Sequence, residues 1–551
     1  MTQFDDKTAE RANQPAYFIR VDGLASMQFS THALLAPTRT THRCMDIPEG
    51  TQQRLTLLQN HATYGEIRVR LADKSGIITD LISSEQTSPP VVTMVNRKVT
   101  LYAGYQDIAE SEFVPRFVGE VREIELVGAK LYEITFTAQT RRWEDLLMID
   151  TKQAETLKLA AIPAIGQTFI VLASAPTPLL TGQALLYRKD GSQYEKLTVT
   201  FVDVPAKRLD LAAGITGMWN DLDNDIFTHA PFVRGNIINV FYALLTGTFE
   251  RIYEPLTGVA ATTDFSLVDF WNIPQGLGIA AGDIDTAGLQ FTRDALYANF
   301  DVDFLWRDAV KARQFFQAQM FLLGFFPFVT ADGKISVRAF VPPGPEVASP
   351  VTLLKQDMVK VPKWKRLIDH HFNRVIVRGD VPVASAQGYS DLATREDTGD
   401  QTDTDEVGIV EINSAGLRTA LSGIALAQEI AARHLRRWVG PPTQTDAETI
   451  LTKRDLQVGD VIEITDPDLP DTTIGAIGLG ARLIEVTRVS VNFMRGVVDV
   501  ELFDHSFGRK WSWIAPNGTP VYGSASATQK RYAFFGGATN QIGGVDGYYS
   551  Y

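Results

Sequence analysis

The sequence is poor in cysteine and in long apolar runs. Its one cysteine, Cys44, excludes an intrachain disulfide and a cysteine-ligated cluster, so the chain must rely on packing, as expected for folding in a reducing cytoplasm. The densest apolar run, 321–329, is too short to span a bilayer and contains Gly324 and Pro327. Residues 1–11 are polar and charged, unlike a signal peptide. We therefore expect no stable membrane insertion.

Positively charged residues are fewer than negatively charged ones. The chain has 52 Lys and Arg residues against 65 Asp and Glu residues, a net charge of −13. Such a molecule is a poor partner for free duplex DNA or an anionic surface, although DNA would pass it without sticking. Hydrophobic residues make up 45% of the 551 residues, an ordinary globular proportion, and at roughly 150 residues per domain this length predicts several domains.

Catalytic and metal-binding motifs are absent as well. The chain contains no Gly-x-Ser-x-Gly, His-Glu-x-x-His or P-loop spacing. His370 and His371 follow Asp369, but adjacent residues before a strand point to opposite faces, which disfavours a shared metal. Cys44, a lone thiol near the N-terminus, is expected to be inert. We predict no catalytic residue, no metal ligand, no cofactor, and a protein that is not an enzyme.

Alternating apolar residues dominate the first 150 residues. Ile67, Val69 and Leu71 share one face of a predicted strand, and residues 132–138 alternate in the same way. Strand patterns return at 334–340, 373–379, 461–465 and 497–503. Between these regions, 185–192 is typical of a hairpin turning at Asp190-Gly191. The sequence therefore predicts two large strand-rich regions with a smaller β-rich unit between them.

Three helices are predicted, at 236–246, 305–323 and 421–438, from apolar stripes that end at a glycine. In the third, the stripe runs from Ile424 to Trp438, His434 is expected beside Trp438, and the polar flank carries Arg433, Arg436 and Arg437. We expect these arginines to face solvent or a neighbour's carboxylates. The acidic stretch 383–407 is predicted to be an exposed loop.

Five segments in order resemble the central hub proteins of phage tails, found in contractile tails, siphophages and gene transfer agents. They are Pro15-Ala-Tyr-Phe-Ile-Arg-Val, the pair Thr100-Leu-Tyr-Ala-Gly-Tyr and Phe117-Val-Gly-Glu-Val, the helix from Asn236, the passage 321–337, and 425–438 running on to 456–471. The likeness covers roughly residues 12–505, but the unit at 155–230 has no counterpart that we can place in the family. Iron–sulfur hubs use several cysteines, so that subtype is excluded.

The resemblance implies a fold that is mainly β with some α and has several domains. These would be two tail-tube-like antiparallel β-barrel domains, an inserted small β domain and a helix-containing α+β domain. The expected boundaries are 1–150 for the first barrel, 151–235 for the insert, 236–345 for the connecting domain, 346–505 for the second barrel and 506–551 for a C-terminal tail.

The resemblance also implies a role in the virion, at the tail tip, after assembly in the host cytoplasm. A hub forms a ring that caps the tail tube, closes the DNA channel before infection and anchors tip or fibre proteins. Its implied partners are itself as a homotrimer, a distal tail protein, a tape measure protein and tail fibre or spike proteins. Three copies would present six barrels to a sixfold tube.

Residues 506–551 combine many glycines with aromatic side chains and few aliphatic ones. Aromatic residues are enriched at interface anchors, and glycine makes an independent fold costly in entropy. We predict a partner interface at Trp511, Trp513, Phe534, Phe535, Tyr548, Tyr549 and Tyr551. The alternative is that the tail adds a strand to the second barrel.

Two other functions remain open from the sequence. One is a tail-associated cell-wall hydrolase, with the insert as a degrading or glycan-binding unit, although no pair of catalytic carboxylates can be identified. The other is a receptor-binding tip protein, although the repeats or heptads of fibre shafts are lacking.

Overall fold

The computed structural model describes residues 14–504 with internal gaps, and short segments beyond them. The gaps are 25, 49, 57–60, 83–93, 95–96, 139–146, 150–154, 177–180, 189–191, 221, 223–224, 229–230, 248–267, 272–275, 299, 307–309, 331, 340–350, 381–387, 441, 472–475 and 494; the segments are 512–514, 533–535, 541–542, 545–546 and 548–550. The protein is mainly β, as the sequence predicts, and its strands form several separate sheets.

The first sheet has seven strands in the order β3-β2-β1-β7-β8-β9-β6. Ile67, Val69 and Leu71 of β6 are buried as their alternation predicts. The bridge between Met45 and Leu71 connects the segment after β3 with β6, so the two edges of the sheet are joined. The strands are β1 (Pro15–Val21), β2 (Met27–Ser30), β3 (Thr40–Arg43), β6 (Ile67–Ala72), β7 (Lys98–Tyr105), β8 (Val114–Gly128) and β9 (Leu131–Ala138), with helix α2 (Ile77–Ile82) beside them.

The second large sheet has the order β23-β29-β30-β31-β28-β24, and β4 also pairs with β30. β23 lies at one edge, while the chain that follows it bridges Met358 to Thr449 and forms β24 at the other edge. The segment 351–366 therefore pairs with both sides of the sheet. Its strands are β4 (Thr51–Thr56), β5 (His61–Tyr64), β23 (Val351–Leu354), β24 (Lys363–Arg366), β28 (Thr443–Ile450), β29 (Val461–Asp471), β30 (Ala476–Asn492) and β31 (Val497–Asp504).

A third sheet of six strands has its own hydrophobic core, which includes Leu186, Leu209 and Ile226. The predicted hairpin is present as β13 and β14, which pair in antiparallel register. A bridge between Leu159 and Leu172 joins the two edge strands. We call this unit the insert; its strands are β11 (Glu155–Lys158), β12 (Phe169–Val171), β13 (Gly182–Tyr187), β14 (Tyr194–Asp203), β15 (Arg208–Leu211) and β16 (Asp225–Thr228).

The central α+β region packs helices against small sheets around the largest core. Asn236 caps the first helix by accepting a hydrogen bond from Ile238 N, and Gly247 ends it in the left-handed conformation at φ 76°, so the prediction for this helix is confirmed. The elements are β17 (Phe232–Asn236), α4 (Ile237–Thr246), β18 (Val268–Trp271), α5 (Thr286–Leu296), β19 (Asp301–Leu305), β21 (Phe325–Val329) and β22 (Ile335–Ala339); β10 (Leu147–Ile149) pairs with β20 (Val310–Lys311).

The same core continues under a second small sheet and a long helix. This sheet has the order β26-β25-β27. The helix has a non-helical residue, Gly423, near its start. The elements are β25 (Arg374–Gly379), β26 (Ser390–Glu396), α7 (Thr398–Thr404), β27 (Ile409–Asn413) and α8 (Thr419–Trp438).

Several expectations need correction. The predicted helix 305–323 is instead the end of β19, the short β20, one α-turn (Ala312–Phe315), a π-turn (Phe316–Met320) and a 3-10 turn (Phe321–Leu323). Crowded phenylalanines there pack on Phe241, and this tertiary packing overrides the 3.6-residue period.

The acidic stretch 383–407 contains β26 and α7, so over these elements it is not a loop. The strand pairs β2–β3, β23–β29 and β25–β27 are parallel, so the sheets are not purely antiparallel.

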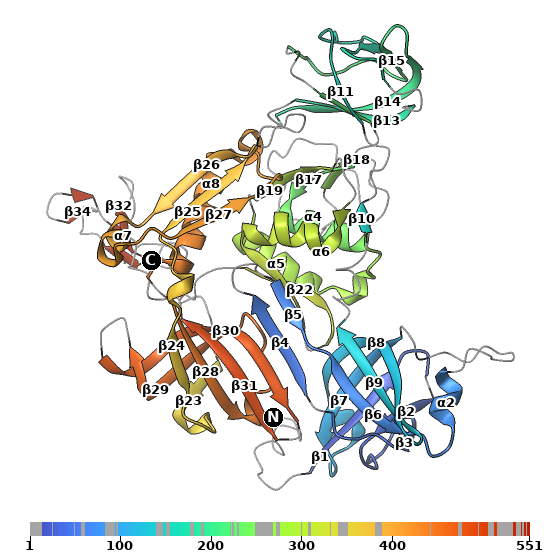
Figure 1. Cartoon of the computed structure of the whole chain (residues 1–551), viewed down its shortest axis with the longest axis vertical. Helices are drawn as coiled ribbons and strands as arrows, with labels where there is room; N and C mark the ends of the chain where they lie inside the picture. Colours follow the sequence, from blue (N-terminus) through green and yellow to red (C-terminus); the bar gives the residue numbers. More distant parts are fainter. Residues whose placement is uncertain are drawn as a thin grey trace.

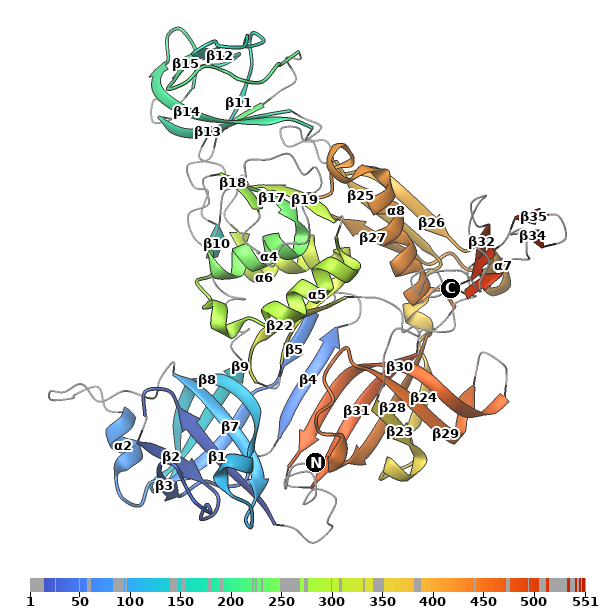
Figure 2. The ribbon, with the colours of Figure 1, turned by 180° about the vertical axis from the view of Figure 1, so that it is seen from behind.

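The two large sheets lie side by side at one end of the molecule, the central region lies above them, and the insert stands at the opposite end of the long axis (Figure 1). The reverse view gives the same three levels (Figure 2). No helix among the described residues is both long and apolar enough to cross a membrane.

Candidate functional site

The joint between the two large sheets brings distant parts of the sequence together. Strand β4 leaves the first region and pairs with β30, Gln53 opposite Val489. One hydrophobic core includes Val69 of the first sheet and Val486 of the second. The rings of Tyr17 and Phe493 lie 5.0 Å apart across the same boundary. Because the two sheets share a core, and β4 from the first region of the sequence is a strand of the second sheet, the two sheets form one unit.

The face of the second sheet away from this core carries a row of charged residues. Lys363, Asp446, Glu501, Arg488 and Arg54 lie opposite one another in register across five strands. The Arg488 and Glu501 side chains approach to 3.9 Å. Only the Lys363–Asp446 and Arg488–Glu501 neighbours have opposite charges and stabilise the sheet; Asp446 faces Glu501 and Arg488 faces Arg54 as like charges.

A neighbouring position on that face holds Glu448, which pairs with Lys360 at 2.8 Å and with Arg495 at 2.9 Å. The hydrogen bond from Lys360 lowers the pKa of Glu448 below its usual range. Burial opposes this shift by a smaller amount than the Lys360 bond contributes, and Arg495 lowers the pKa further. Glu448 therefore stays ionised and compensates two cations.

Strand β24 forms one edge of the second sheet and has the sequence Lys-Trp-Lys-Arg. Lys363, Lys365 and Arg366 are exposed. Lysine on an edge strand discourages unintended pairing with another sheet, which is the ordinary explanation for this pattern.

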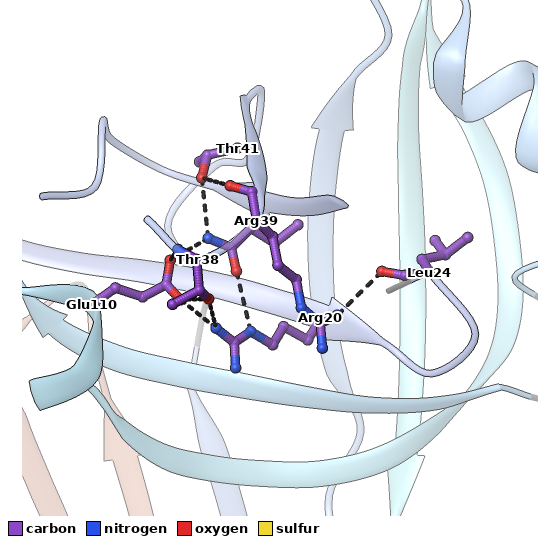
Figure 3. Close-up of polar contacts among 7 residues, drawn as sticks. Arg20, Leu24, Thr38, Arg39, Thr41 and Glu110 are labelled. Carbon is purple, nitrogen blue, oxygen red and sulfur yellow. Dashed lines mark hydrogen bonds and ion pairs between the residues drawn. The ribbon is translucent and has the colours of Figure 1, made fainter. Parts of the chain in front are cut away.

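Figure 3 shows a polar network on the first sheet, around Glu110. The Glu110 carboxylate accepts hydrogen bonds from Arg20, from Gln28 Nε2 at 2.5 Å, and from the backbone N–H of Thr38 at 3.1 Å and its hydroxyl. Burial raises the pKa of Glu110, but these hydrogen bonds and the Arg20 charge outweigh it, so the pKa is lowered. The network fixes the loop before β3, where Leu35 is 55% exposed.

The histidines occupy separate environments. His371 Nε2 lies 2.5 Å from Asp400 Oδ2 in a buried pair, whereas His370 stacks on Trp438. His434 is buried, and its Nε2 hydrogen-bonds to the Leu322 carbonyl at 2.8 Å. Within the described part of the chain, no group of three or more His, Cys, Asp and Glu side chains is arranged to hold a metal ion.

The arginines of α8 differ from the prediction. Arg433 and Arg437 are buried, and only Arg436 is half-buried. Arg437 forms a bidentate ion pair with Glu485 of β30: Nη1 donates to Oε2, and Nη2 donates to Oε1 at 3.1 Å. Arg433 donates to the Leu296 carbonyl and lies over the Tyr297 ring. Ile424, expected in the apolar stripe, is 53% exposed; it is the first helical residue after the break at Gly423.

Sequence reasoning missed the residue that joins the insert to the central region. Tyr187 of β13 donates a hydrogen bond to Asp303 of β19 at 2.8 Å, and both residues are fully buried. Burial and the nearby Asp303 carboxylate raise the pKa of Tyr187 well above its ordinary value. A tyrosine in a strand and an aspartate 116 positions away carry no spacing signal, so only the tertiary structure could reveal the pair.

One open hollow of 610 Å³ lies beside β25 and β26 and is lined by Arg378, Gly388, Tyr389, Ser390, Asp391 and Asn413. Arg378 is already paired there with Asp391 at 2.5 Å and with Glu411 at 2.7 Å. These ion pairs use the charges that a polar ligand would need, so the hollow is a weak candidate for a binding site.

Cys44 is half-buried, and burial raises the pKa of its thiol to about 11, with the Asp73 charge adding to the effect. A protonated thiol is a poor nucleophile, which agrees with the expected inert role.

The predicted interface residues of the C-terminal tail fall on short strands or outside the described residues. Trp513 lies on β32 (Ser512–Ile514), Phe534 and Phe535 lie on β33 (Ala533–Phe535), and Tyr548 and Tyr549 lie on β36 (Tyr548–Ser550). Trp511 and Tyr551 are outside the described residues. These strands pair with one another in the order β32-β36-β33 and are not part of the second large sheet.

No family model and no curated protein matches the chain. Among solved structures, the 43 kDa tail protein of prophage MuSo2 from Shewanella oneidensis is 9% identical, with a TM-score of 0.38 over 90% of this chain and 99% of that one. A tail protein from Neisseria meningitidis MC58 is 10% identical, with a TM-score of 0.35 over 90% and 97%. The prophage tail protein gp18 from Listeria monocytogenes EGD-e is 8% identical, with a TM-score of 0.33 over 83% and 88%. All three TM-scores are below 0.5, so these similarities do not establish the family or the activity of this chain.

Proposed function

We propose that this chain is the structural hub of a bacteriophage tail tip or baseplate. Three copies form a ring that caps the tail tube, closes the DNA channel before infection and anchors tip or fibre proteins. The protein acts by assembly and is not an enzyme. Its neighbours are a distal tail protein, a tape measure protein and fibre or spike proteins.

The observation that carries this proposal is the common core of the two large sheets, together with β4, which the first region of the sequence contributes to the second sheet. In each sheet, the chain connects both edges, at Met45 in the first and through 351–366 in the second, which supports two tube-like barrels per chain. A rigid pair of barrels repeated three times supplies the six units that match a sixfold tube. The ordered segments that resemble hub proteins lie in these sheets and in the central region between them.

The mass of the assembled particle tests the trimer. Mass photometry of the purified chain, or imaging of isolated tail tips, is expected to give a species of three times 60.9 kDa. A stable monomer inside assembled tips would contradict the proposal.

The net charge of −13 supports a channel that DNA crosses without binding. Filter binding with duplex DNA at low salt is expected to show no retention by the trimer, since tight retention needs uncompensated cations that release counterions. Strong retention that falls steeply with added salt would contradict a passive channel.

We also propose that residues 506–551 dock the hub to the rest of the tip. Deleting residues from 525 onward removes β33 and β36 and leaves the two large sheets intact. The truncated chain is expected to form the same trimer but to be missing from complete tips. Infectious tips assembled from the truncated chain would show that the tail does not dock.

A further inference from the structure

One face of the insert carries two exposed phenylalanines on either side of a charged residue. Phe169 of β12 lies opposite Asp210 of β15, and Asp210 lies opposite Phe201 of β14 on its other side. These three residues form one row across three neighbouring strands. Because residues directly opposite one another in a sheet point to the same side, their side chains share one face. Phe169 is 38% exposed and Phe201 is 57% exposed.

A second row lies beside the first, two residues further along the strands. In this row Arg208 of β15 lies between Val171 of β12 and Asp203 of β14. The other face of β15 is buried, since Leu209 and Leu211 belong to the hydrophobic core of the insert. Both rows therefore point away from that core. We call the six residues of the two rows the platform.

The charged side chains of the platform are held in place by their neighbours. Arg208 and Asp210 form an ion pair in which Nε lies 2.8 Å from Oδ1 and Nη2 donates to Oδ2 at 3.2 Å. The Arg208 guanidinium also lies over the Phe169 ring, 5.4 Å from its centre. Asp203 Oδ1 accepts a hydrogen bond from Ala206 N at 3.0 Å. A ligand would meet groups that are already ordered, which lowers the entropy cost of binding.

Single exposed phenylalanines are common and usually need no explanation. Phe169 has one, because the Arg208 cation covers part of its ring. Phe201 has no ring or cation contact with the rest of the described chain. The pairing of β14 with β15 also shifts register between Val199 and Phe201, and such bulges re-aim side chains beside functional sites. Phe201 is thus turned outward next to a charged pair, with an open ring face.

The platform by itself is too small for a stable protein partner and offers no strand edge. At roughly 4.8 Å per strand and 3.4 Å per residue, its two rows cover about 10 by 7 Å. A stable protein interface covers about 800 Å² on each partner. A peptide can extend a sheet only at a free edge, but the bridge between Leu159 and Leu172 joins the two edges of this sheet. The size and the closed edges favour a small ligand.

The charges of the platform favour a neutral ligand. One arginine stands against two aspartates, a net charge of −1, so a phosphate or nucleic acid would be repelled. A neutral ligand with hydroxyl groups can bind without breaking the ion pair, since a carboxylate offers about four lone-pair sites and Arg208 occupies two on Asp210. Both side chains remain accessible, at 38% and 30% exposure.

We infer that the platform binds a neutral oligosaccharide. A pyranose ring has an apolar C–H face that stacks on an aromatic ring, and its rim of hydroxyl groups bonds to carboxylate and guanidinium groups. Phe169 and Phe201 each take one sugar face, and Asp210 with Arg208 between them binds the hydroxyl groups and fixes the orientation. The insert stands at the opposite end of the molecule from the two large sheets, so a glycan can approach it without meeting them (Figures 1 and 2). This inference goes beyond the hub function and does not rest on it.

Saturation-transfer NMR of the full chain with maltotriose, cellotriose, chitotriose and mannotriose tests the inference. At least one of these neutral trisaccharides is expected to bind. Phe201→Ala should raise its Kd about tenfold by removing one stacking face, and Asp210→Ala should do the same by removing hydroxyl acceptors. Phe201→Trp should keep the affinity, because it keeps an aromatic face. Phe291→Ala is the matched control, since Phe291 is 70% exposed on α5, outside the insert.

Thermal unfolding of each variant checks that the insert stays folded, and Phe201→Ala removes only an exposed side chain. Three results would overturn the inference. They are binding of none of the four sugars, binding left unaltered by Phe201→Ala or by Asp210→Ala, and tighter binding of the anionic trigalacturonic acid than of every neutral sugar. A trimer that forms normally but binds no sugar would leave the hub proposal standing.

Discussion

The buried pair of Arg437 and Glu485 links the last turn of α8 to β30, and its loss should be costly. The two side chains are only 2% and 8% exposed, and the Arg437 guanidinium also lies 5.0 Å from the centre of the Phe503 ring. Arg437→Ala leaves the Glu485 carboxylate buried without its partner. Removing one member of a buried ion pair costs about 3–5 kcal/mol in the free energy of unfolding.

The pair of Arg374 and Glu396 is a matched control, because it has the same chemistry at 35% and 36% exposure. Arg374→Ala should cost less than about 1 kcal/mol, since water replaces the lost partner. Urea unfolding read by hydrogen exchange measures each variant where its pair lies, in α8 and β30 for Arg437→Ala and in β25 and β26 for Arg374→Ala. The double variant Arg437→Met with Glu485→Leu should recover most of the loss, because no buried charge remains.

Equal losses in Arg437→Ala and Arg374→Ala would refute the reasoning, since burial would then not decide the cost of breaking the pair. A double variant as unstable as Arg437→Ala would also refute it, because the loss would come from packing and not from an uncompensated charge.

Three further predictions concern buried polar groups. Burial, with the Arg437 and Arg433 charges, lowers the pKa of His434 to about 4, against an opposing hydrogen bond to Leu322. The free energy of unfolding is therefore highest above the unfolded-state pKa near 6.5 and falls by up to about 3 kcal/mol as the pH drops toward 4. The urea midpoints of His434→Gln should not change with pH in this way, and an unchanged pH dependence would exclude His434 as its source. Tyr187→Phe leaves Asp303 without its hydroxyl donor and should cost about 1–3 kcal/mol, measured as faster proteolysis between the insert and the central region than in wild type. Because the pKa of Cys44 is raised to about 11, iodoacetamide should label the folded chain far more slowly than the urea-unfolded chain at pH 8, and equal rates would contradict the burial of the thiol.

Regular local patterns predicted the elements that tertiary packing leaves undisturbed. The alternation of β6 and the capped stripe of α4 both appear in the structure, because β6 buries alternate side chains and Asn236 and Gly247 set the ends of α4. The helix predicted over 305–323 failed where phenylalanines at irregular spacing fill a crowded core around Phe241. There the packing of aromatic rings outweighs the helical period.

Buried charges were the other failure, since composition treats arginine and glutamate as surface residues. Arg437 and Glu110 are buried because distant partners compensate them, and those partners lie 48 and 90 positions away in sequence. Such pairs have no local pattern. The place of β4 in the second sheet was missed for the same reason, as its polar sequence Thr-Gln-Gln-Arg-Leu-Thr gives no indication of which sheet it joins.

The place of β4 in the second sheet has a consequence for synthesis of the chain. Its Gln53 side chain accepts a hydrogen bond from Val458 N across 405 positions of sequence. At ribosomal rates, those residues take roughly 20–80 s to emerge, so β4 waits that long without its partner strand. Contacts of such sequence separation also form slowly once the chain is complete. One edge of β4 pairs at once with β5, but the other stays unpaired in the nascent chain until β30 is made, so we expect a slow step late in folding.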